Sequence, residues 1–319
     1  MKRKILRGCG FFMGYVLLFV LLCPLMWLYG PFPYYRVLVT DMIANSSRSY
    51  IAYTLMGSSR IEEVTSLTSL QQMTVEPVIT DRESSFVDEA NGITIESIEG
   101  RKFKGKVMIV EDPSQIRVAM TEDMGTAGQR LADMIAGQKA VAGVNGGGFF
   151  DPNTQGSGAL PKGTTIIDGC VVSDVGEEDY MGVVGFTRGG VLTLKKVTAS
   201  EALGLGYVQA VTFGPFLLVD GVPQIVDDGG RGVAPRTGIG QRADGAVIFV
   251  VIDGRNAGWS MGANLRDLMN VFVEYQAVNA ANLDGGSSTE MVYKGQTINR
   301  LWNLLGSRYL ATSFVVMPR

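Results

Sequence analysis

Residues 246–255 read Ala-Val-Ile-Phe-Val-Val-Ile-Asp-Gly-Arg, an apolar run that stops at an aspartate and a glycine. Short runs of this kind, apolar or alternating and separated by glycines, recur through the chain after Gly92. Such runs are typical of β-strands. We therefore predict strands at residues 106–110, 116–120, 141–144, 164–167, 183–186, 191–194, 246–252 and 313–317.

Turns and helices complete the expected architecture. Asp220-Gly221, residues 243–245 and Lys294-Gly295 contain residues that tolerate a positive φ angle, so they fit hairpin turns. Apolar residues at helical spacing predict two helices, at residues 126–138 and 262–275. Few helices among many strands predict an α+β fold, with a β-rich body built on a mixed sheet, rather than a regular alternation of strands and helices.

The composition excludes several classes of function. The 319 residues include no histidine, so a Ser-His-Asp triad, an imidazole base and the usual histidine-bearing zinc sites are ruled out. Carboxylates must then carry any proton transfer. A net charge of −3 without a strongly basic block argues against a nucleic-acid partner. Cys9 and Cys23 lie in an apolar N-terminal segment and Cys170 lies in the body, an arrangement too scattered for a thiolate zinc site.

The N-terminal segment predicts a membrane anchor. Residues 9–29 carry no charge and are preceded by Lys2, Arg3, Lys4 and Arg7. At about 1.5 Å per residue, such a helix spans the roughly 30 Å hydrocarbon core of a bilayer. The basic flank favours a cytoplasmic N-terminus, and therefore a single-pass protein of the cell membrane with an extracytoplasmic body. A cleavable signal peptide is the alternative, but no small-x-small site follows, and the aromatic residues within 27–35 suit a membrane interface.

The sequence suggests three parts. These are a cytoplasmic tip and transmembrane anchor at residues 1–30, a stem and linker at 31–90, and the functional domain at 91–319. Residues 36–70 are polar and rich in Ser and Thr, which favours a stem or a packed accessory helix. Residues 74–89 are rich in charge and include Pro77, which favours a linker.

Four clusters combine glycines with polar residues and are the candidate functional sites. They read Asn145-Gly-Gly-Gly-Phe-Phe-Asp151, Phe213-Gly-Pro215, Asp253-Gly-Arg255 and Asn282-Leu-Asp-Gly-Gly-Ser-Ser288. Apolar runs end just before three of the clusters, which predicts that Asn145, Asp253 and Asp284 lie at strand ends, where sheets open into clefts. Glycine beside them lets a backbone approach a ligand closely. Neither of the common phosphate-binding patterns, G-x-x-x-x-G-K-[ST] or G-x-G-x-x-G, occurs at these clusters.

Each cluster also has a structural interpretation. Asp253-Gly254, taken alone, is above all a turn signal, and the loop after Asn145 could be strained without any function. A divalent cation bound by Asp151, Asp253 and Asp284 stays open as well, because hard cations take oxygen ligands, although no cofactor is predicted.

In their order along the chain, the clusters resemble the phosphodiester glycosidase family, from about residue 103 to residue 317. The motifs that carry the resemblance are Val144-Asn-Gly-Gly-Gly-Phe-Phe-Asp-Pro152, Leu160-Pro-Lys-Gly163, Thr212-Phe-Gly-Pro-Phe-Leu217, Arg236-Thr-Gly-Ile-Gly240, Asp253-Gly-Arg255 and Asn282-Leu-Asp-Gly-Gly-Ser-Ser288. The closing loop of the family often reads Asp-Gly-Gly-Gly-Ser. Ser287 therefore stands where a third glycine is common, and which serine faces the ligand stays open.

The resemblance implies hydrolysis of the bond between the anomeric carbon of a sugar and a phosphate, in a cell-surface or exopolysaccharide glycan. A carboxylate would act at the anomeric carbon, and cations would hold the departing phosphate. We expect Asp284 and Asp253 to form the carboxylate pair, with Asp151 in reserve. We also expect Asn145 and Ser288 to orient sugar hydroxyls.

Cationic side chains and loop residues complete the expected substrate site. Arg236 and Arg255 suit the phosphate, because a guanidinium grips two phosphate oxygens at once, and Lys162 is a weaker candidate. The other expected substrate-binding positions are Gly146, Gly285, Gly286 and Ser287. Glu290, by contrast, is expected to be structural.

Two further functions stay open. A non-catalytic carbohydrate-binding protein of the cell surface would keep the fold and tolerate loss of the aspartates, and a metal-dependent phosphodiesterase would break the P–O bond instead of the C–O bond. An active site of any of these kinds requires the loops around positions 145, 236, 253 and 284 to converge in space.

Overall fold

The computed structural model describes residues 78–151, 157–176, 181–225, 227–303 and 306–319, together with Thr40, Thr54, Gly57 and Ile61. The predicted membrane segment at 9–29 and most of the predicted stem lie outside the described residues. The chain divides into two compact units, Met1–Thr74 and Val75–Arg319. Within the described residues, no helix has both the length and the apolar character needed to cross a bilayer.

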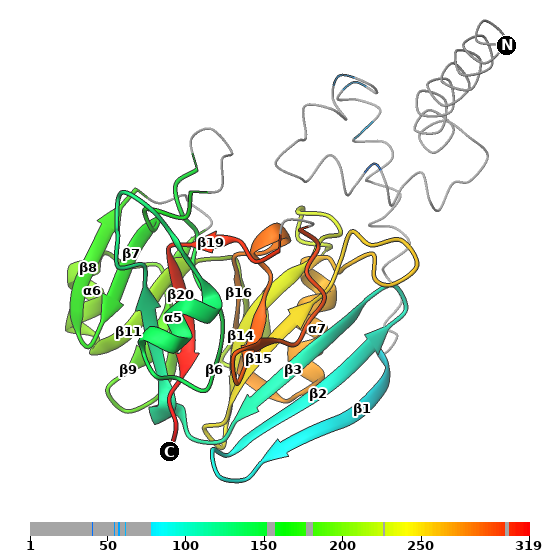
Figure 1. Ribbon diagram of the computed structural model, residues 1–319, viewed down its shortest axis with the longest axis horizontal. Coiled ribbons are helices and arrows are strands. Elements are labelled where there is room, and N and C mark those ends of the chain that lie inside the picture. The colour runs from blue at the N-terminus through cyan, green and yellow to red at the C-terminus, as the bar shows by residue number, and fades with distance from the viewer. Residues whose placement is uncertain are drawn as a thin grey trace, which may run out of the picture. The chain divides into compact units, whose positions relative to one another are not determined.

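The largest sheet of the second unit has eight strands (Figure 1). Their spatial order is β1 (Ile79–Asp88), β2 (Ile93–Gly100), β3 (Lys104–Val110), β15 (Val247–Ile252), β14 (Arg236–Arg242), β16 (Ala277–Leu283), β12 (Phe216–Val219) and β13 (Val222–Pro223). Part of the stretch interpreted as a linker from the sequence is thus an edge strand, β1, which pairs with β2 over its whole length.

Two five-stranded sheets and three helices complete the unit as far as it is described. One sheet has the order β18 (Gln296–Thr297), β17 (Met291–Tyr293), β6 (Ala142–Asn145), β20 (Thr312–Val316) and β4 (Ile116–Met120). The other has the order β10 (Leu192–Lys195), β9 (Gly182–Thr187), β11 (Tyr207–Phe213), β7 (Gly163–Ile167) and β8 (Cys170–Val175). A small pair joins β19 (Tyr309–Leu310) to β5 (Gln129–Arg130), and the helices are α5 (Leu131–Gly137), α6 (Ala199–Gly204) and α7 (Leu265–Glu274).

The β-rich body with few helices is confirmed, but the expectation of a mixed sheet is wrong for the described residues, where every strand pair is antiparallel. Parallel neighbours need long crossover connections, whereas antiparallel strands can be joined by tight turns. The three predicted turns are confirmed as such hairpins: Asp220-Gly221 joins β12 to β13, residues 243–245 join β14 to β15, and Lys294-Gly295 joins β17 to β18.

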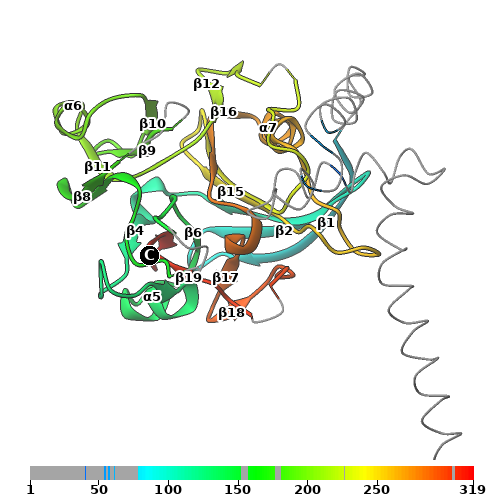
Figure 2. The same cartoon turned by 90° about the horizontal axis from the view of Figure 1, so that it is seen from above.

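The sheets are stacked in layers, as Figure 2 shows. Helix α7 covers one face of the eight-stranded sheet, and the sheet that contains β6 and β20 packs against the other face and is covered in turn by α5. The core between the two sheets includes Phe249, Leu283, Phe314 and Val144, all fully buried. The strand β15 is therefore buried on both faces, which explains its unbroken apolar sequence.

Helix α7 confirms the helix predicted at 262–275 and shows how it is held. The side chain of Asn264 accepts a hydrogen bond from the backbone N–H of Asp267, and the Asp267 carboxylate accepts one from the backbone N–H of Asn264, which forms a capping box. Phe272 packs directly on the sheet. An added Cβ at Gly238 or Gly240 of β14 would lie 2.7 Å from its ring, so these strand positions require glycine.

Asp88 joins the end of β1 to the hairpin of β17 and β18. It accepts hydrogen bonds from the Tyr293 hydroxyl at 2.5 Å and from Asn91 at 3.0 Å, and it pairs with Lys294 at 3.0 Å. The bonds from Tyr293, Asn91 and Lys294 hold the pKa of the Asp88 carboxyl well below its usual range.

We expect Asp88→Asn to lower the melting temperature at pH 7, by an amount that shrinks as the pH falls. A carboxyl whose pKa is depressed in the folded state stabilises the fold above its unfolded pKa of about 3.9 and loses that contribution in more acidic solution. Calorimetry of both proteins at pH 7, 5 and 3 measures the difference. A gap that stays constant across this range would show that the charge of Asp88 does not contribute.

Candidate active site

Three strands deliver the polar residues predicted to lie at their ends. Asn145 is the last residue of β6, Asp253 directly follows β15, and Asp284 directly follows β16. These placements confirm the strand-end prediction. Because β15 and β16 flank β14 and both run antiparallel to it, the two aspartates leave the eight-stranded sheet at the same edge.

Asn145 ties three of the predicted loops together. Its Nδ2 donates to the backbone carbonyl of Asp284 at 2.6 Å, and its Oδ1 accepts from the Thr237 hydroxyl at 2.8 Å and from the backbone N–H of Glu290 at 3.1 Å. Because both ends of its amide are bound to protein and the side chain is fully buried, Asn145 positions the loops, in contrast to the role expected from the sequence.

Glycines allow the loops to approach closely. The Gly286 N–H donates to the carbonyl of Pro235 at 2.9 Å, and the Gly146 carbonyl accepts from the Asp284 N–H at 3.1 Å. A Cβ added at Gly285 would lie 2.9 Å from the Pro235 carbonyl oxygen, and one at Gly254 would lie 2.6 Å from the Pro235 nitrogen. The loops around 145, 236, 253 and 284 therefore converge, and side chains in place of these glycines would separate them.

The carboxylate of Asp284 lies within this convergence. Its Oδ1 accepts from the N–H of Gly285 at 2.9 Å. Burial raises the pKa of Asp284, and the neighbouring Ser288, Arg308 and Gly285 oppose part of that rise. The buried Ser288 hydroxyl has no hydrogen bond of standard geometry among the described residues. Ser288 is thus a buried neighbour of the Asp284 carboxylate.

Arg308 bridges two of the loops, and the sequence did not suggest it. Its Nη2 pairs with the Asp151 carboxylate at 2.8 Å, its Nη1 donates to the Ser287 hydroxyl, and the guanidinium lies 5.0 Å from the centre of the Phe149 ring. The positive charge also lowers the pKa of Asp284, whereas Asp151 raises it. The structure therefore groups Asp284 with Asp151 and Arg308.

Arg255 is the second cation at this centre. Its guanidinium lies 5.0 Å from the centre of the Trp302 ring, and a Cβ added at Gly286 would lie 3.6 Å from its Nη1. Burial lowers the pKa of Arg255, and its Nε has no hydrogen-bond partner among the described residues. Its φ angle of +55° is one that residues other than glycine rarely adopt. A strained, partly buried cation suits an anionic ligand.

Asp253 lies elsewhere than predicted. Its carboxylate accepts from Trp259 Nε1 at 2.8 Å, from Asn299 Nδ2 at 3.2 Å and from the Arg300 N–H at 3.0 Å. The side chain faces a groove lined by strands β1 to β3 and residues 297–300. The expected pairing of Asp253 with Asp284 is therefore not what the geometry provides, because sequence order alone does not show which way each strand-end side chain turns.

The other two cations predicted to bind the phosphate, Arg236 and Lys162, contact different groups. Arg236 is buried, and its guanidinium donates to the backbone carbonyls of Ala263 at 3.0 Å and Arg231 at 2.8 Å, which shapes the loop before β14. Lys162 has its ammonium 5.7 Å from the centre of the Phe150 ring. Among the described residues, no group of three or more acidic or thiol side chains is arranged to hold a metal ion.

Glu290 is buried and structural, as its carboxylate accepts from the hydroxyls of Thr297, at 2.7 Å, and of Ser307. The second bond fixes the loop that carries Arg308. No sequence pattern predicts this loop, since residues 306–308 form neither an apolar run nor one of the glycine clusters.

Comparison with known proteins identifies the family. The family model described as phosphodiester glycosidase matches residues 138–317, more than half of the chain. The chain belongs to the phosphodiester glycosidase family. The matched range includes the loops at 145, 236, 253 and 284 and the Arg308 loop, so the whole candidate site lies in the family's domain.

The proteins similar to this chain include a prophage protein and two solved structures. The SPbeta prophage-derived uncharacterized protein YomE of Bacillus subtilis (strain 168) is 27% identical over 182 residues, which cover 54% of this chain and 27% of YomE. The match thus spans about a quarter of that relative.

The solved structures are similar in fold. The catalytic domain of zebrafish N-acetylglucosamine-1-phosphodiester alpha-N-acetylglucosaminidase, auto-inhibited by its pro-peptide, aligns with a TM-score of 0.58 at 20% identity, covering 78% of this chain and 86% of that one. A hypothetical protein from Synechocystis aligns with a TM-score of 0.54 at 17% identity, covering 74% of this chain and 64% of that one.

The Arg255 site predicts a variant that separates activity from stability. Asparagine tolerates a positive φ angle, so Arg255→Asn should leave the melting temperature unchanged or raise it. Loss of the cation should lower kcat/KM for a phosphodiester substrate on the order of a hundredfold. Lys139→Asn is the matched control, because Lys139 is an exposed cation with a φ angle of +57°. Equal kinetics for the two variants would remove Arg255 from the site.

Proposed function

We propose that this protein is a hydrolase that cleaves the bond between a sugar's anomeric carbon and a phosphate, in a phosphate-bearing glycan of the cell surface or exopolysaccharide. The observation that carries this proposal is the grouping of the Asp284 carboxylate with two guanidinium groups, those of Arg308 and Arg255, at the convergence of the family's loops. A carboxylate beside cations matches a substrate whose reacting carbon becomes positive while its leaving group is an anion.

In the proposed reaction Asp284 acts as the base. Its raised pKa suits the removal of a proton from water, whose oxygen forms a bond to the anomeric carbon as the bond from that carbon to the phosphate oxygen breaks. The phosphate departs with the bonding electrons as a monoester, and Arg255 holds its charge. Arg308 fixes Asp151 and Ser287 around the sugar. Because a phosphate is a good leaving group, little acid assistance is needed.

We further propose that the body works outside the cytoplasm on a single-pass anchor. The proposal rests on the uncharged residues 9–29, which follow a basic N-terminal segment. The predicted parts are 1–30, 31–90 and 91–319, but strand β1 belongs to the body, so the body begins before residue 91. The lipid bilayer is then one partner and the phosphoglycan the other, and no nucleic acid is involved. Protease added to intact cells should digest the body. A body that survives this treatment would show that it faces the cytoplasm.

Hydrolysis in ¹⁸O-labelled water tests the proposed reaction. The full chain in detergent is incubated with a panel of sugar-1-phosphodiesters, and the products are analysed by mass spectrometry. Label in the reducing sugar supports attack at carbon, whereas label in the phosphate would identify a phosphodiesterase that breaks the P–O bond. Binding without turnover, unaffected by Asp284→Asn, would identify a carbohydrate-binding protein. We propose that no cofactor is needed, so a chelator should leave the rate unchanged.

A further inference from the structure

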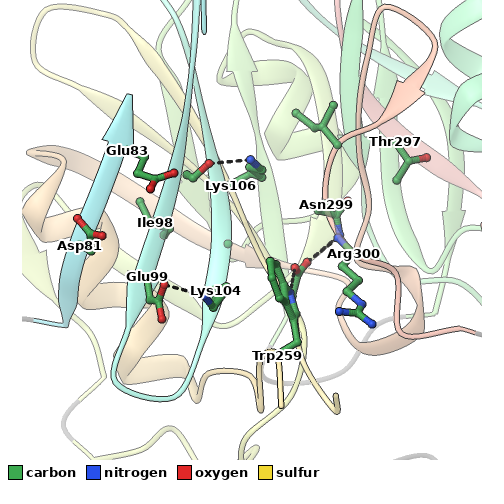
Figure 3. A pocket seen from close by; sticks show the side chains of 14 residues that line it. Asp81, Glu83, Ile98, Glu99, Lys104, Lys106, Trp259, Thr297, Asn299 and Arg300 are labelled. Carbon is green, nitrogen blue, oxygen red and sulfur yellow. Dashed lines mark hydrogen bonds and ion pairs between the residues drawn. The ribbon is translucent and has the colours of Figure 1, made fainter. Parts of the chain in front are cut away.

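A groove of about 510 Å³, shown in Figure 3, is lined in part by Asp253, which lies two residues before Arg255 in the sequence. Strands β1, β2 and β3 form one wall, and residues 297–300 form the other. Its lining combines acidic, basic and aromatic side chains, chiefly Asp81, Glu83, Lys104, Lys106, Trp259 and Arg300. Asp253, Trp259 and residues 297–300 of this lining lie within the range that the family model matches, but the proposed chemistry at Asp284 does not use the groove.

Asp253 fixes one side of the groove. Its carboxylate is buried and bonded to Trp259 Nε1, Asn299 Nδ2 and the Arg300 N–H, so it holds the indole and the 299–300 backbone in one arrangement. All of these donors are protein groups. Asp253 is therefore a positioning residue that shapes the groove.

The groove and the candidate active site share a common boundary made of two loops. The loop after β15 contributes Arg255 and Trp259, and the loop before Gly306 contributes Arg300 and Trp302. The cations and aromatics pair crosswise, with Arg255 5.0 Å from the Trp302 ring centre and Arg300 5.4 Å from that of Trp259. Arg255 faces the Asp284 loop while Trp259 lines the groove, so one loop borders both the candidate site and the groove.

The groove combines cations on one side with hydroxyl-binding groups on the other, which suits an anion next to a polyhydroxylated unit. Lys104 is paired with Glu99 at 2.8 Å. Lys106 donates to the Ser97 hydroxyl at 2.7 Å, and its charge, without a direct ion pair, opposes part of the rise that burial causes in the pKa of the Asp253 carboxyl. Trp259 is 40% exposed, which leaves apolar surface for a sugar or polyol. Asp81 and Glu83 on the opposite rim can accept hydrogen bonds from hydroxyls.

We propose that this groove binds the leaving-group side of the substrate, and that Lys106 and Arg300 hold a second phosphate one unit beyond the bond that is cut. The substrate class is then a glycan or polyol chain with repeating phosphates. This inference rests on the proposed function for the placement of the cut, but the phosphate site itself can be measured without turnover.

Binding of glycerol bisphosphate to the full chain tests the site directly. Calorimetry at fixed ionic strength compares it with glycerol monophosphate, because salt screens such contacts. We expect the bisphosphate to bind the unmodified protein on the order of tenfold more tightly than it binds Lys106→Gln or Arg300→Gln. Lys195→Gln, which removes an exposed charge on β10 outside the groove, should bind like the unmodified protein. No binding to the unmodified protein, or equal binding to all four, would overturn the proposal.

Kinetics then place the second phosphate relative to the reaction. Two substrates with the same sugar 1-phosphate are compared, one esterified to methanol and one to glycerol phosphate. We expect KM for the second substrate to be on the order of tenfold lower, and Lys106→Gln to remove that advantage while the methyl ester reacts as before. If the lower KM of the glycerol phosphate ester persists in Lys106→Gln, Lys106 does not hold the second phosphate. Bisphosphate binding without hydrolysis of either substrate would instead contradict the proposed function alone.

Discussion

Asp284→Asn is expected to abolish turnover while raising the melting temperature at neutral pH. The amide cannot take a proton from water, so the rate should fall on the order of a thousandfold or more. The stability effect follows from the raised pKa of Asp284. A carboxyl of raised pKa favours the folded state in acid and loses that contribution as the pH rises through the folded-state pKa, because the fold must then contain a poorly solvated charge. Asparagine has no such charge.

The measurement is a pair of melting curves with a rate assay at pH 4 and pH 7. The stabilisation by Asp284→Asn should be small at pH 4 and larger at pH 7, and its sign is opposite to that of the effect expected for Asp88→Asn. Asp123→Asn serves as the control, since Asp123 is an exposed carboxyl outside the site. Full activity in Asp284→Asn would remove this residue from the mechanism, and a lower melting temperature at pH 7 would show that its charge stabilises the loops instead.

The strands that could be predicted from the sequence are those with a continuous or alternating run of apolar residues. The run at 246–252 became β15 and the alternating run at 116–120 became β4, because burial on one or both faces is visible in the order of residues. Strand β14 could not be predicted in this way. Its glycines at 238 and 240 weaken a strand signal, and they are explained only by the ring of Phe272, which comes from a helix further along the chain.

The candidate site shows a similar division. The glycine clusters predicted which loops would meet, since close backbone approach leaves a mark in the sequence at Gly146, Gly254 and Gly285. The side chains that contact one another across the site could not be predicted from any local pattern. Arg308 contacts Asp151 at a separation of 157 residues, and the turn of Asp253 toward Trp259 is decided by packing around residues 297–300. Long-range pairing of this kind has no local pattern from which a single sequence could predict it.

Replacing Arg308 is expected to have the second-largest effect. The guanidinium holds Asp151 and Ser287 at once, and a lysine offers a single charged centre that cannot reproduce this fork. Arg308→Lys should therefore lower kcat/KM on the order of a hundredfold, and Arg308→Met on the order of a thousandfold. Ser287→Gly should retain most activity, because it keeps the ion pair between Arg308 and Asp151.

The pH profile of kcat/KM shows whether Arg308 acts through Asp284. The positive charge of Arg308 lowers the pKa of Asp284, so its loss in Arg308→Met should raise that pKa further and move the acidic limb of the profile to higher pH. Arg308→Lys keeps the positive charge, so the acidic limb of the profile should stay at nearly the same pH. The rate should still fall, because lysine cannot bridge Asp151 and Ser287. A limb that does not move in Arg308→Met would mean that Arg308 only holds the loop, because a purely structural role changes the rate without changing the protonation of the base.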